Sequence, residues 1–143
     1  MTMTTNKKKI LIADDEAAIR QLLTRMLSKE YCVIEAQNGE IAVSIARQEK
    51  PDLVLMDMMM PKMDGLTACS AIKQDQATKG ISVVMLTAIG YSLNRKLAEQ
   101  VAGADGYITK PFDSQELLCT VGRLLSLRSQ VSDKPGTQVP NNV

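Results

Sequence analysis

The chain has 143 residues, of which 45% are hydrophobic and 23% charged, and its formal net charge is +1. This length and composition are typical of one globular domain, and the charge offers no overall attraction to nucleic acid or to an anionic membrane. The chain contains no histidine, which excludes Ser-His-Asp triads, histidine-ligated zinc and a phosphohistidine within this molecule.

Two further features bear on where the protein works. No apolar stretch reaches the roughly 20 residues of a membrane span, and the opening MTMTTNKKKI lacks the apolar centre of a secretory signal. The three cysteines, Cys32, Cys69 and Cys119, lie far apart and form no CxxC pair. We therefore expect a cytoplasmic protein whose cysteines are buried, reduced thiols.

The chain opens with a short basic run and continues as an alternation of apolar segments. Residues 1–7 are predicted to be a flexible, solvated leader. Beyond them, short apolar runs bounded by charged or turn residues predict buried strands, and apolar residues at helical spacing predict the helices between them. The strands are expected at residues 9–13, 31–36, 52–57, 82–88 and 106–109, and the helices at 17–28, 41–50, 66–74, 93–101 and 114–125.

The regular alternation of five strands and five helices predicts a doubly wound α/β fold. The sheet should be parallel and covered by helices on both faces, with the strand at 52–57 in a central position because it is apolar throughout. From about residue 129 the chain is polar and contains Pro and Gly. Residues 129–143 are therefore predicted to be a disordered tail or the stub of a linker.

Chemically complementary side chains occur at the carboxyl ends of four predicted strands, the edge at which such sheets bind ligands. The first strand ends at Asp14 and Asp15, the third at Asp57, the fourth at Thr87 and the fifth at Lys110. Converging carboxylates repel one another unless a cation lies among them, and oxygen ligands alone favour Mg²⁺ where phosphate is handled. Such a site, with a lysine opposite the metal, can receive a phosphoryl group, and Asp57 could be its nucleophile.

Each of these residues also has an ordinary structural explanation. Asp14 or Asp15 could cap the first helix, and Asp57 could be a turn residue. Thr87 could be an ordinary strand threonine, and Lys110 could be a solvated lysine. The methionines that flank Asp57 are more simply core residues. The coincidence of these residue types at four strand ends favours a functional site.

The segments LIADDE, DLVLMDMMMPKMDG, VVMLTA and GADGYITKPF, in this order and spacing, resemble the receiver domain of bacterial two-component response regulators. The resemblance covers residues 8–128 and implies the strand order 2-1-3-4-5 of chemotaxis members of that family. It implies a phosphorylation-dependent switch that accepts a phosphoryl group from a sensor histidine kinase or a histidine phosphotransfer protein. It implies no enzyme activity beyond the chain's own phosphorylation and its slow self-dephosphorylation.

The resemblance also assigns roles to the residues of the acidic cluster. Asp57 is the phosphoacceptor, and Lys110 pairs with it and then with the phosphoryl oxygens. Mg²⁺, for which Mn²⁺ can substitute, is bound directly by Asp15 and Asp57 together with the backbone carbonyl of Met59. Asp14 reaches the ion mainly through water.

The remaining implied residues concern the response and its duration. Thr87 binds the phosphoryl group, and Tyr107 is the aromatic residue that moves inward with it. Met59 and Ile89 occupy the two positions that tune dephosphorylation, and because both are apolar we expect slow loss of the phosphoryl group. The Lys110–Pro111 peptide bond is expected to be cis.

The output of the switch is less closely defined by the sequence. On the resemblance, a protein target reads the face formed by the fourth helix, fifth strand and fifth helix, in a monomer or a phosphorylation-promoted dimer. No basic recognition helix follows residue 128, so we expect no direct DNA binding by this chain. We expect a stand-alone regulator in preference to a part of a longer one.

Two other classes share part of this pattern. A Mg²⁺-dependent phosphatase with an aspartyl nucleophile would also place an Asp at a strand end, but the family pattern of such enzymes is DxDxT. In this chain Met59 occupies the position of the second acid. A flavodoxin-like nucleotide binder needs a phosphate-cradling loop after the first strand, and the acids there would repel a bare phosphate. We therefore favour a receiver domain over a phosphatase or a nucleotide-binding protein.

Overall fold

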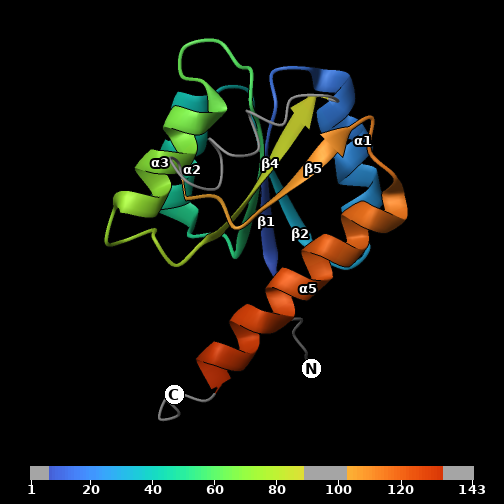
Figure 1. Ribbon diagram of the computed structural model, residues 1–143, viewed down its shortest axis with the longest axis vertical. Helices are drawn as coiled ribbons and strands as arrows, with labels where there is room; N and C mark the ends of the chain where they lie inside the picture. Colours follow the sequence, from blue (N-terminus) through green and yellow to red (C-terminus); the bar gives the residue numbers. More distant parts are fainter. Residues whose placement is uncertain (1–6, 89–102, 134–143) are drawn as a thin grey trace.

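A parallel five-stranded sheet forms the centre of the computed structural model, which describes residues 7–88 and 103–133 (Figure 1). The strand order is β2-β1-β3-β4-β5, and every neighbouring pair is parallel. This arrangement confirms the predicted fold class and the order that the resemblance implied. The strands are β1 (Lys9–Ala13), β2 (Cys32–Ala36), β3 (Leu53–Asp57), β4 (Ser82–Ala88) and β5 (Gly106–Lys110).

Helices cover both faces of the sheet (Figure 1). On one face lie α1 (Ala17–Leu27) and α5 (Ser114–Asp133), and on the other lie α2 (Gly39–Glu49) and α3 (Gly65–Gln74). The helix predicted at 93–101 lies outside the described residues. None of the helices that the structure describes combines the length and apolar character needed to cross a membrane.

The last helix is longer than the sequence analysis predicted. α5 continues to Asp133, so residues 129–133 are helical where the sequence analysis predicted a disordered tail or the stub of a linker. Polar composition alone does not end a helix, and the first proline after Ser114 is Pro135. The final turns of α5 project beyond the sheet (Figure 1).

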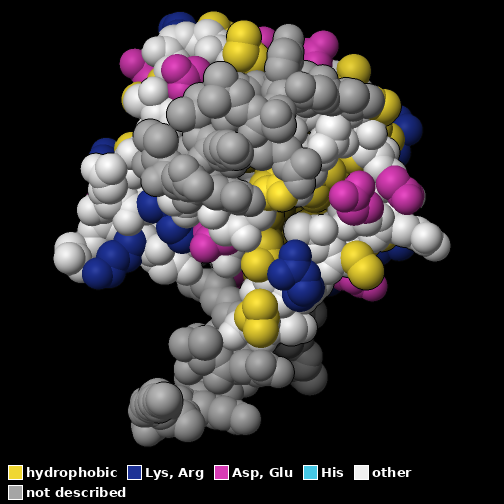
Figure 2. Space-filling model, viewed as in Figure 1, with side chains coloured by type: hydrophobic (Ala, Val, Ile, Leu, Met, Phe, Trp, Pro, Cys, Tyr) yellow, Lys and Arg dark blue, Asp and Glu magenta, His cyan; other side chains and the backbone are white. Residues whose placement is uncertain are grey.

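Two apolar layers sandwich the sheet because successive strand residues point to opposite faces. Leu11, Val54 and Met85 pack on the side of α2 and α3, whereas Ile12 and Leu55 pack on the side of α1 and α5. All residues of β3 are buried, as expected for a central strand. On the face seen in Figure 2, basic and acidic side chains of the described residues are interspersed, in keeping with the small net charge.

The methionines around Asp57 divide into two groups. Met56, Met58 and Met60 are buried in the layer beneath α2 and α3, which confirms their prediction as core residues. Met59 is 78% exposed, and its side chain therefore lies at the protein surface.

The prediction of three buried thiols was wrong for two of them. None of the three cysteines, all of which the structure describes, forms a disulfide; only Cys69 is buried, whereas Cys32 and Cys119 are exposed. Cys32 begins β2, which lies at the edge of the sheet, and Cys119 lies on α5. Edge strands and the outer faces of helices leave alternate side chains in solvent, and hydropathy alone does not reveal this.

These environments predict unequal thiol reactivity. Burial raises the pKa of the Cys69 thiol to about 12, so at pH 8 this thiol should remain protonated and react slowly with a disulfide reagent. Two of the three thiols should react quickly in the folded protein, and all three should do so in urea. Cys32→Ser and Cys119→Ser should each remove one fast-reacting thiol, whereas equal rates for all three would contradict the burial of Cys69.

Candidate functional site

Three carboxylates gather at the carboxyl ends of the strands, as the sequence predicted. Asp57 is the last residue of β3, and Asp14 and Asp15 directly follow β1, its neighbour in the sheet. One carboxylate oxygen from each of the three residues lies within 4.8 Å of the others. Asp14 is fully buried and Asp57 is 7% exposed, whereas Asp15 is exposed. The cluster is therefore open to solvent on the Asp15 side.

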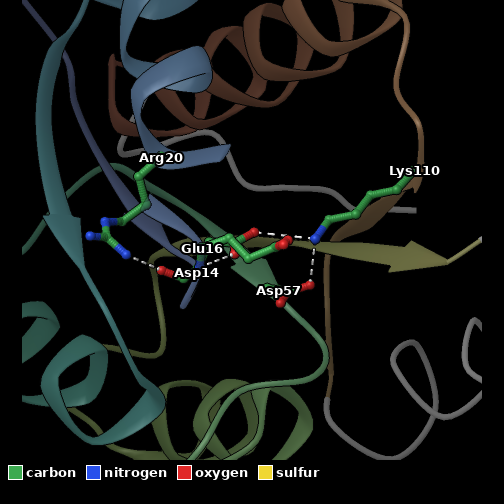
Figure 3. Close-up of polar contacts among 5 residues, drawn as sticks. All are labelled: Asp14, Glu16, Arg20, Asp57 and Lys110. Carbon is green, nitrogen blue, oxygen red and sulfur yellow. Dashed lines mark hydrogen bonds and ion pairs between the residues drawn. The ribbon is translucent and has the colours of Figure 1, made fainter. Parts of the chain in front are cut away.

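A lysine from the end of β5 reaches into this cluster (Figure 3). The Nζ of Lys110 donates hydrogen bonds to Asp57 Oδ1 at 2.9 Å and to Asp14 Oδ2 at 3.2 Å. Its side chain is only 23% exposed, so Lys110 is not the solvated lysine of the simpler explanation. The peptide bond between Lys110 and Pro111 is cis, as the resemblance implied.

The turn after β1 is held by hydrogen bonds to Asp14, and neither acid caps α1. The N-cap residue of α1 is Glu16, whose side chain makes no capping hydrogen bond. The Glu16 N–H instead donates to Asp14 Oδ1 at 2.9 Å, and the Asp14 N–H donates to the Ala36 carbonyl at 3.1 Å. The Arg20 guanidinium donates to the Asp14 carbonyl at 2.7 Å. Sequence analysis missed Arg20, because an arginine in an amphipathic helix is ordinarily solvated.

Backbone contacts of the loop between β3 and α3 fix the position of the carboxyl end of β3, where Asp57 lies. The Met58 N–H donates to the Leu86 carbonyl at 3.2 Å, and the Gly65 N–H donates to the Met58 carbonyl at 2.9 Å. A Cβ at Gly65 would overlap the carbonyl oxygen of Asp57, so this close approach of two backbones requires glycine. Asp64 caps α3, accepting a backbone N–H of its first turn at 2.8 Å.

Thr87 offers an unused hydroxyl beside this cluster. It follows Leu86, the residue of β4 that pairs in register with Asp57. Thr87 is 1% exposed, and its Oγ1 has no hydrogen-bond partner within the described residues. A buried hydroxyl left unpaired costs about 1–3 kcal/mol. Thr87 is therefore poised to donate to a group that enters the site.

The other residues that the resemblance implied lie on β5, just after β3, or outside the described part of the chain. Tyr107 pairs in register with Met85, and its half-buried ring packs against the apolar layer beneath α2 and α3. Met59 lies two residues after Asp57 with its apolar side chain exposed. Ile89 lies outside the described residues.

The charges of the cluster do not balance. Burial, together with the neighbouring Asp14 and Asp15 carboxylates, raises the pKa of Asp57 even though Lys110 lowers it. Burial lowers the pKa of Lys110, but its contacts with Asp57 and Asp14 outweigh this effect and raise the pKa overall. One ammonium thus faces three carboxylates. A hard divalent cation with oxygen ligands fits this excess negative charge.

The sequence and the fold identify the family. The family model for the response regulator receiver domain matches residues 10–121, and the chain belongs to this family. The chain is 43% identical over 129 residues to the transcriptional regulatory protein ResD of Bacillus subtilis (strain 168), covering 90% of this chain and 52% of that protein. The chain thus spans about half the length of this curated relative.

Solved structures agree with this assignment. The chemotaxis protein CheY4 of Vibrio cholerae has a TM-score of 0.76 and 30% identity, over 82% of this chain and 98% of that one. The receiver domain of a sensor histidine kinase from Pseudomonas aeruginosa PAO1 has a TM-score of 0.77 and 28% identity, over 84% and 98%. The latter structure contains a magnesium ion coordinated in its active site cleft.

Proposed function

We propose that Asp57 accepts a phosphoryl group from the phosphohistidine of a sensor histidine kinase or a histidine phosphotransfer protein. The observation that carries this proposal is the position of Asp57, which lies in a cluster of three carboxylates with the Lys110 ammonium 2.9 Å from its Oδ1. The chain's own catalysis is confined to this transfer and to slow loss of the phosphoryl group. Membership of the receiver family supports the same conclusion.

Magnesium fits the cluster and would be held directly by Asp15 and Asp57 and mainly through water by Asp14, with Mn²⁺ as a substitute. The backbone carbonyl of Met59 is a further ligand on the family resemblance. The carboxylates of all three acids come close enough together to share one ion, and a receiver relative contains magnesium in its active site cleft. When bound, the ion would neutralise negative charge on the acids and on the phosphoryl oxygens.

The chain's own residues can perform the remaining parts of the transfer. A carboxylate oxygen of Asp57 forms a bond to phosphorus as the bond from phosphorus to the donor's histidine nitrogen breaks. The electron pair of the broken bond stays on the imidazole. Lys110 turns from the carboxylates towards the phosphoryl oxygens, and the Thr87 hydroxyl, which lacks another described partner, donates to one of them. Positioning and charge stabilisation supply most of the rate.

The output of the site is a change in conformation that a partner protein detects. In this proposal Thr87 moves towards the phosphoryl group and Tyr107 moves inward, and both lie on the adjacent strands β4 and β5. The affected surface includes β5 and α5, while the predicted fourth helix lies outside the described residues. A shift between two conformations of this kind requires only that the phosphorylated state favour one of them.

The test is the incorporation of phosphate from a small acyl phosphate or from a purified histidine kinase. Incorporation should require Mg²⁺ or Mn²⁺ and should cease in EDTA. The label should be lost in base or hydroxylamine, and peptide mapping should place it on the segment containing Asp57. Label on a serine or threonine, or incorporation unaffected by metal removal, would overturn the proposal.

A further inference from the structure

Asp14 is held from two sides by two cations (Figure 3). Lys110 Nζ contacts the Asp14 carboxylate at 3.2 Å. The Arg20 guanidinium lies on the other side of the residue, where its Nη1 donates to the backbone carbonyl at 2.7 Å. Arg20 therefore engages the main chain of the acidic turn and leaves the carboxylate to other partners.

Every polar group of Asp14 has a partner in this arrangement. The N–H donates to Ala36, the carbonyl accepts from Arg20, Oδ1 accepts from the Glu16 N–H and Oδ2 accepts from Lys110. The proposed function withdraws one of these partners, because Lys110 must turn towards the phosphoryl oxygens. The contact from Arg20 is on the main chain and does not depend on the position of Lys110.

Arg20 is itself oriented by residues of α1 and β2. Its Nε donates to Glu35 Oε1 at 3.1 Å, and Thr24 Oγ1 donates to the other carboxylate oxygen of Glu35 at 3.0 Å. The Arg20 side chain is 16% exposed and that of Glu35 is 40% exposed. A planar guanidinium can hold two acceptors in fixed directions, which a lysine ammonium on a flexible stem does less well.

The charge of Arg20 is balanced locally. Glu35 pairs with the guanidinium, so the two side chains together add no net charge beside the carboxylates of Asp14, Asp15 and Asp57. Arg20 can therefore hold the acidic turn without weakening its attraction for a cation. Removing Glu35 would release Arg20 from its orientation and also leave an unbalanced positive charge near the site.

We propose that Arg20 is a positioning residue that sets the geometry of the Asp14–Asp15 turn for metal binding, with Glu35 holding Arg20 in place. This inference rests on the proposed function, because it concerns the same acidic cluster. Asp14 and Asp15 lie between β1 and α1, and the contact from Arg20 ties this short segment to the helix that follows it. Looser coupling at this point would let the carboxylates spread apart under their mutual repulsion.

A purely structural ion pair would behave differently. Arg20 is only 16% exposed and Asp14 is buried, so Arg20→Ala should lower the urea midpoint of the metal-free protein, but a purely structural role would leave the Mg²⁺ affinity of the folded protein unchanged. Partners that orient metal ligands, by contrast, typically change metal affinity about 10- to 100-fold when they are removed. The proposal therefore predicts weaker Mg²⁺ binding by the folded protein, whatever the size of the change in stability.

The first measurement is a titration of the full chain with Mg²⁺. Binding is detected by calorimetry or by the displacement of Mn²⁺, which electron paramagnetic resonance reports. Arg20→Ala should bind Mg²⁺ roughly tenfold more weakly or worse, and Arg20→Lys should fall between this variant and the parent. Arg25→Ala is the matched control, because Arg25 is an exposed arginine in the last turn of the same helix. Its affinity should equal that of the parent.

The second measurement tests whether Glu35 acts through Arg20. Glu35→Ala alone should weaken Mg²⁺ binding, but it should cause little further loss in the Arg20→Ala background, because interacting residues are not additive. Amide exchange in the metal-free protein supplies an independent readout. The Glu16 N–H, which donates to Asp14 Oδ1, should exchange faster in Arg20→Ala than in the parent or in Arg25→Ala.

The outcomes separate this inference from the proposed function. If the parent binds Mg²⁺ and accepts phosphate while Arg20→Ala binds Mg²⁺ equally well, the positioning role is wrong and the proposed function stands. If the parent binds no Mg²⁺, the proposed metal site is wrong. The Glu16 exchange rate then still decides whether Arg20 holds the turn, and an unchanged rate would overturn that role as well.

Discussion

Asp57→Asn is expected to abolish phosphoryl acceptance and, in the absence of metal, to stabilise the protein at neutral pH. The loss of function follows because an amide cannot serve as the nucleophile that the carboxylate supplies. The gain in stability follows because burial and the neighbouring Asp14 and Asp15 carboxylates disfavour the charged form of Asp57 in the folded protein. Asn keeps a carbonyl oxygen that can still accept from Lys110. A single stabilising substitution commonly raises the free energy of unfolding by about 0.5–2 kcal/mol.

The pH dependence of this stabilisation has a defined sign. The folded-state pKa of Asp57 is raised above the ordinary value of 3.8, so between these two values the folded state binds more protons than the unfolded state. The free energy of unfolding of the parent should therefore fall as pH rises from about that ordinary value through the raised one. Asp57→Asn lacks this loss, so its advantage should be small below about pH 4 and should grow as the pH rises through the raised pKa of Asp57.

Thermal or urea unfolding at several pH values, with EDTA and then with Mg²⁺, measures both parts of this prediction. Mg²⁺ should stabilise the parent through preferential binding to the folded state, and it should stabilise Asp57→Asn much less. Asp15→Asn is the control, since Asp15 is exposed and removal of its charge should stabilise the metal-free protein less. An Asp57→Asn protein less stable than the parent at neutral pH without metal would show that the Lys110 pair outweighs burial and repulsion.

The lifetime of the phosphoryl group should be controlled by the apolar side chains at Met59 and Ile89. Hydrolysis requires a water molecule aligned behind phosphorus, opposite Asp57, and polar side chains at these two positions could orient it. Met59 is 78% exposed beside the site and is apolar, so it offers such a water no strong hydrogen bond. Met59→Asn combined with Ile89→Glu should therefore shorten the lifetime at least about tenfold, since positioned acid–base groups commonly contribute more than that.

The lifetime is measured by following loss of label from the purified phosphorylated chain after the donor has been removed. Met59→Leu with Ile89→Val is the matched control, because it changes the same positions and keeps them apolar. This control should retain the parental lifetime. If the Asn and Glu variant also lost its label at the parental rate, solvent would reach the phosphoryl group independently of these two side chains.

The fold and the acidic cluster were predictable because both depend on patterns that are local in the chain. Apolar runs and helical spacing identify the buried segments, and the regular alternation of strands with helices permits a parallel sheet with few alternatives. In a parallel sheet the carboxyl ends of the strands share one edge. Asp14, Asp57 and Lys110 were therefore expected to meet although they are distant in sequence, and they do so within hydrogen-bond distance.

The errors arose where exposure or helix length depends on how elements pack. The sequence analysis expected Cys32, Cys69 and Cys119 to be buried alike. Only Cys69 is buried, because it lies on a helix surface that faces the sheet. Met59 belongs to a run of methionines whose other members are buried, and its exposure reflects the direction of the chain after β3. The extra residues of α5 lack a Pro or Gly that would have ended the helix earlier.

By itself the sequence determined the class of fold, the edge of the sheet that carries the acids and the residue types available at that edge. Each of these depends only on the spacing of apolar residues and on the order of the strands and helices along the chain. Only the tertiary structure decided the contacts of single atoms. It revealed Arg20 on the carbonyl of Asp14, Glu35 on Arg20 and the unpaired hydroxyl of Thr87 among the described residues. Such features depend on atoms from separate segments of the chain, and the distances between these atoms depend on how the elements pack, which no local pattern records.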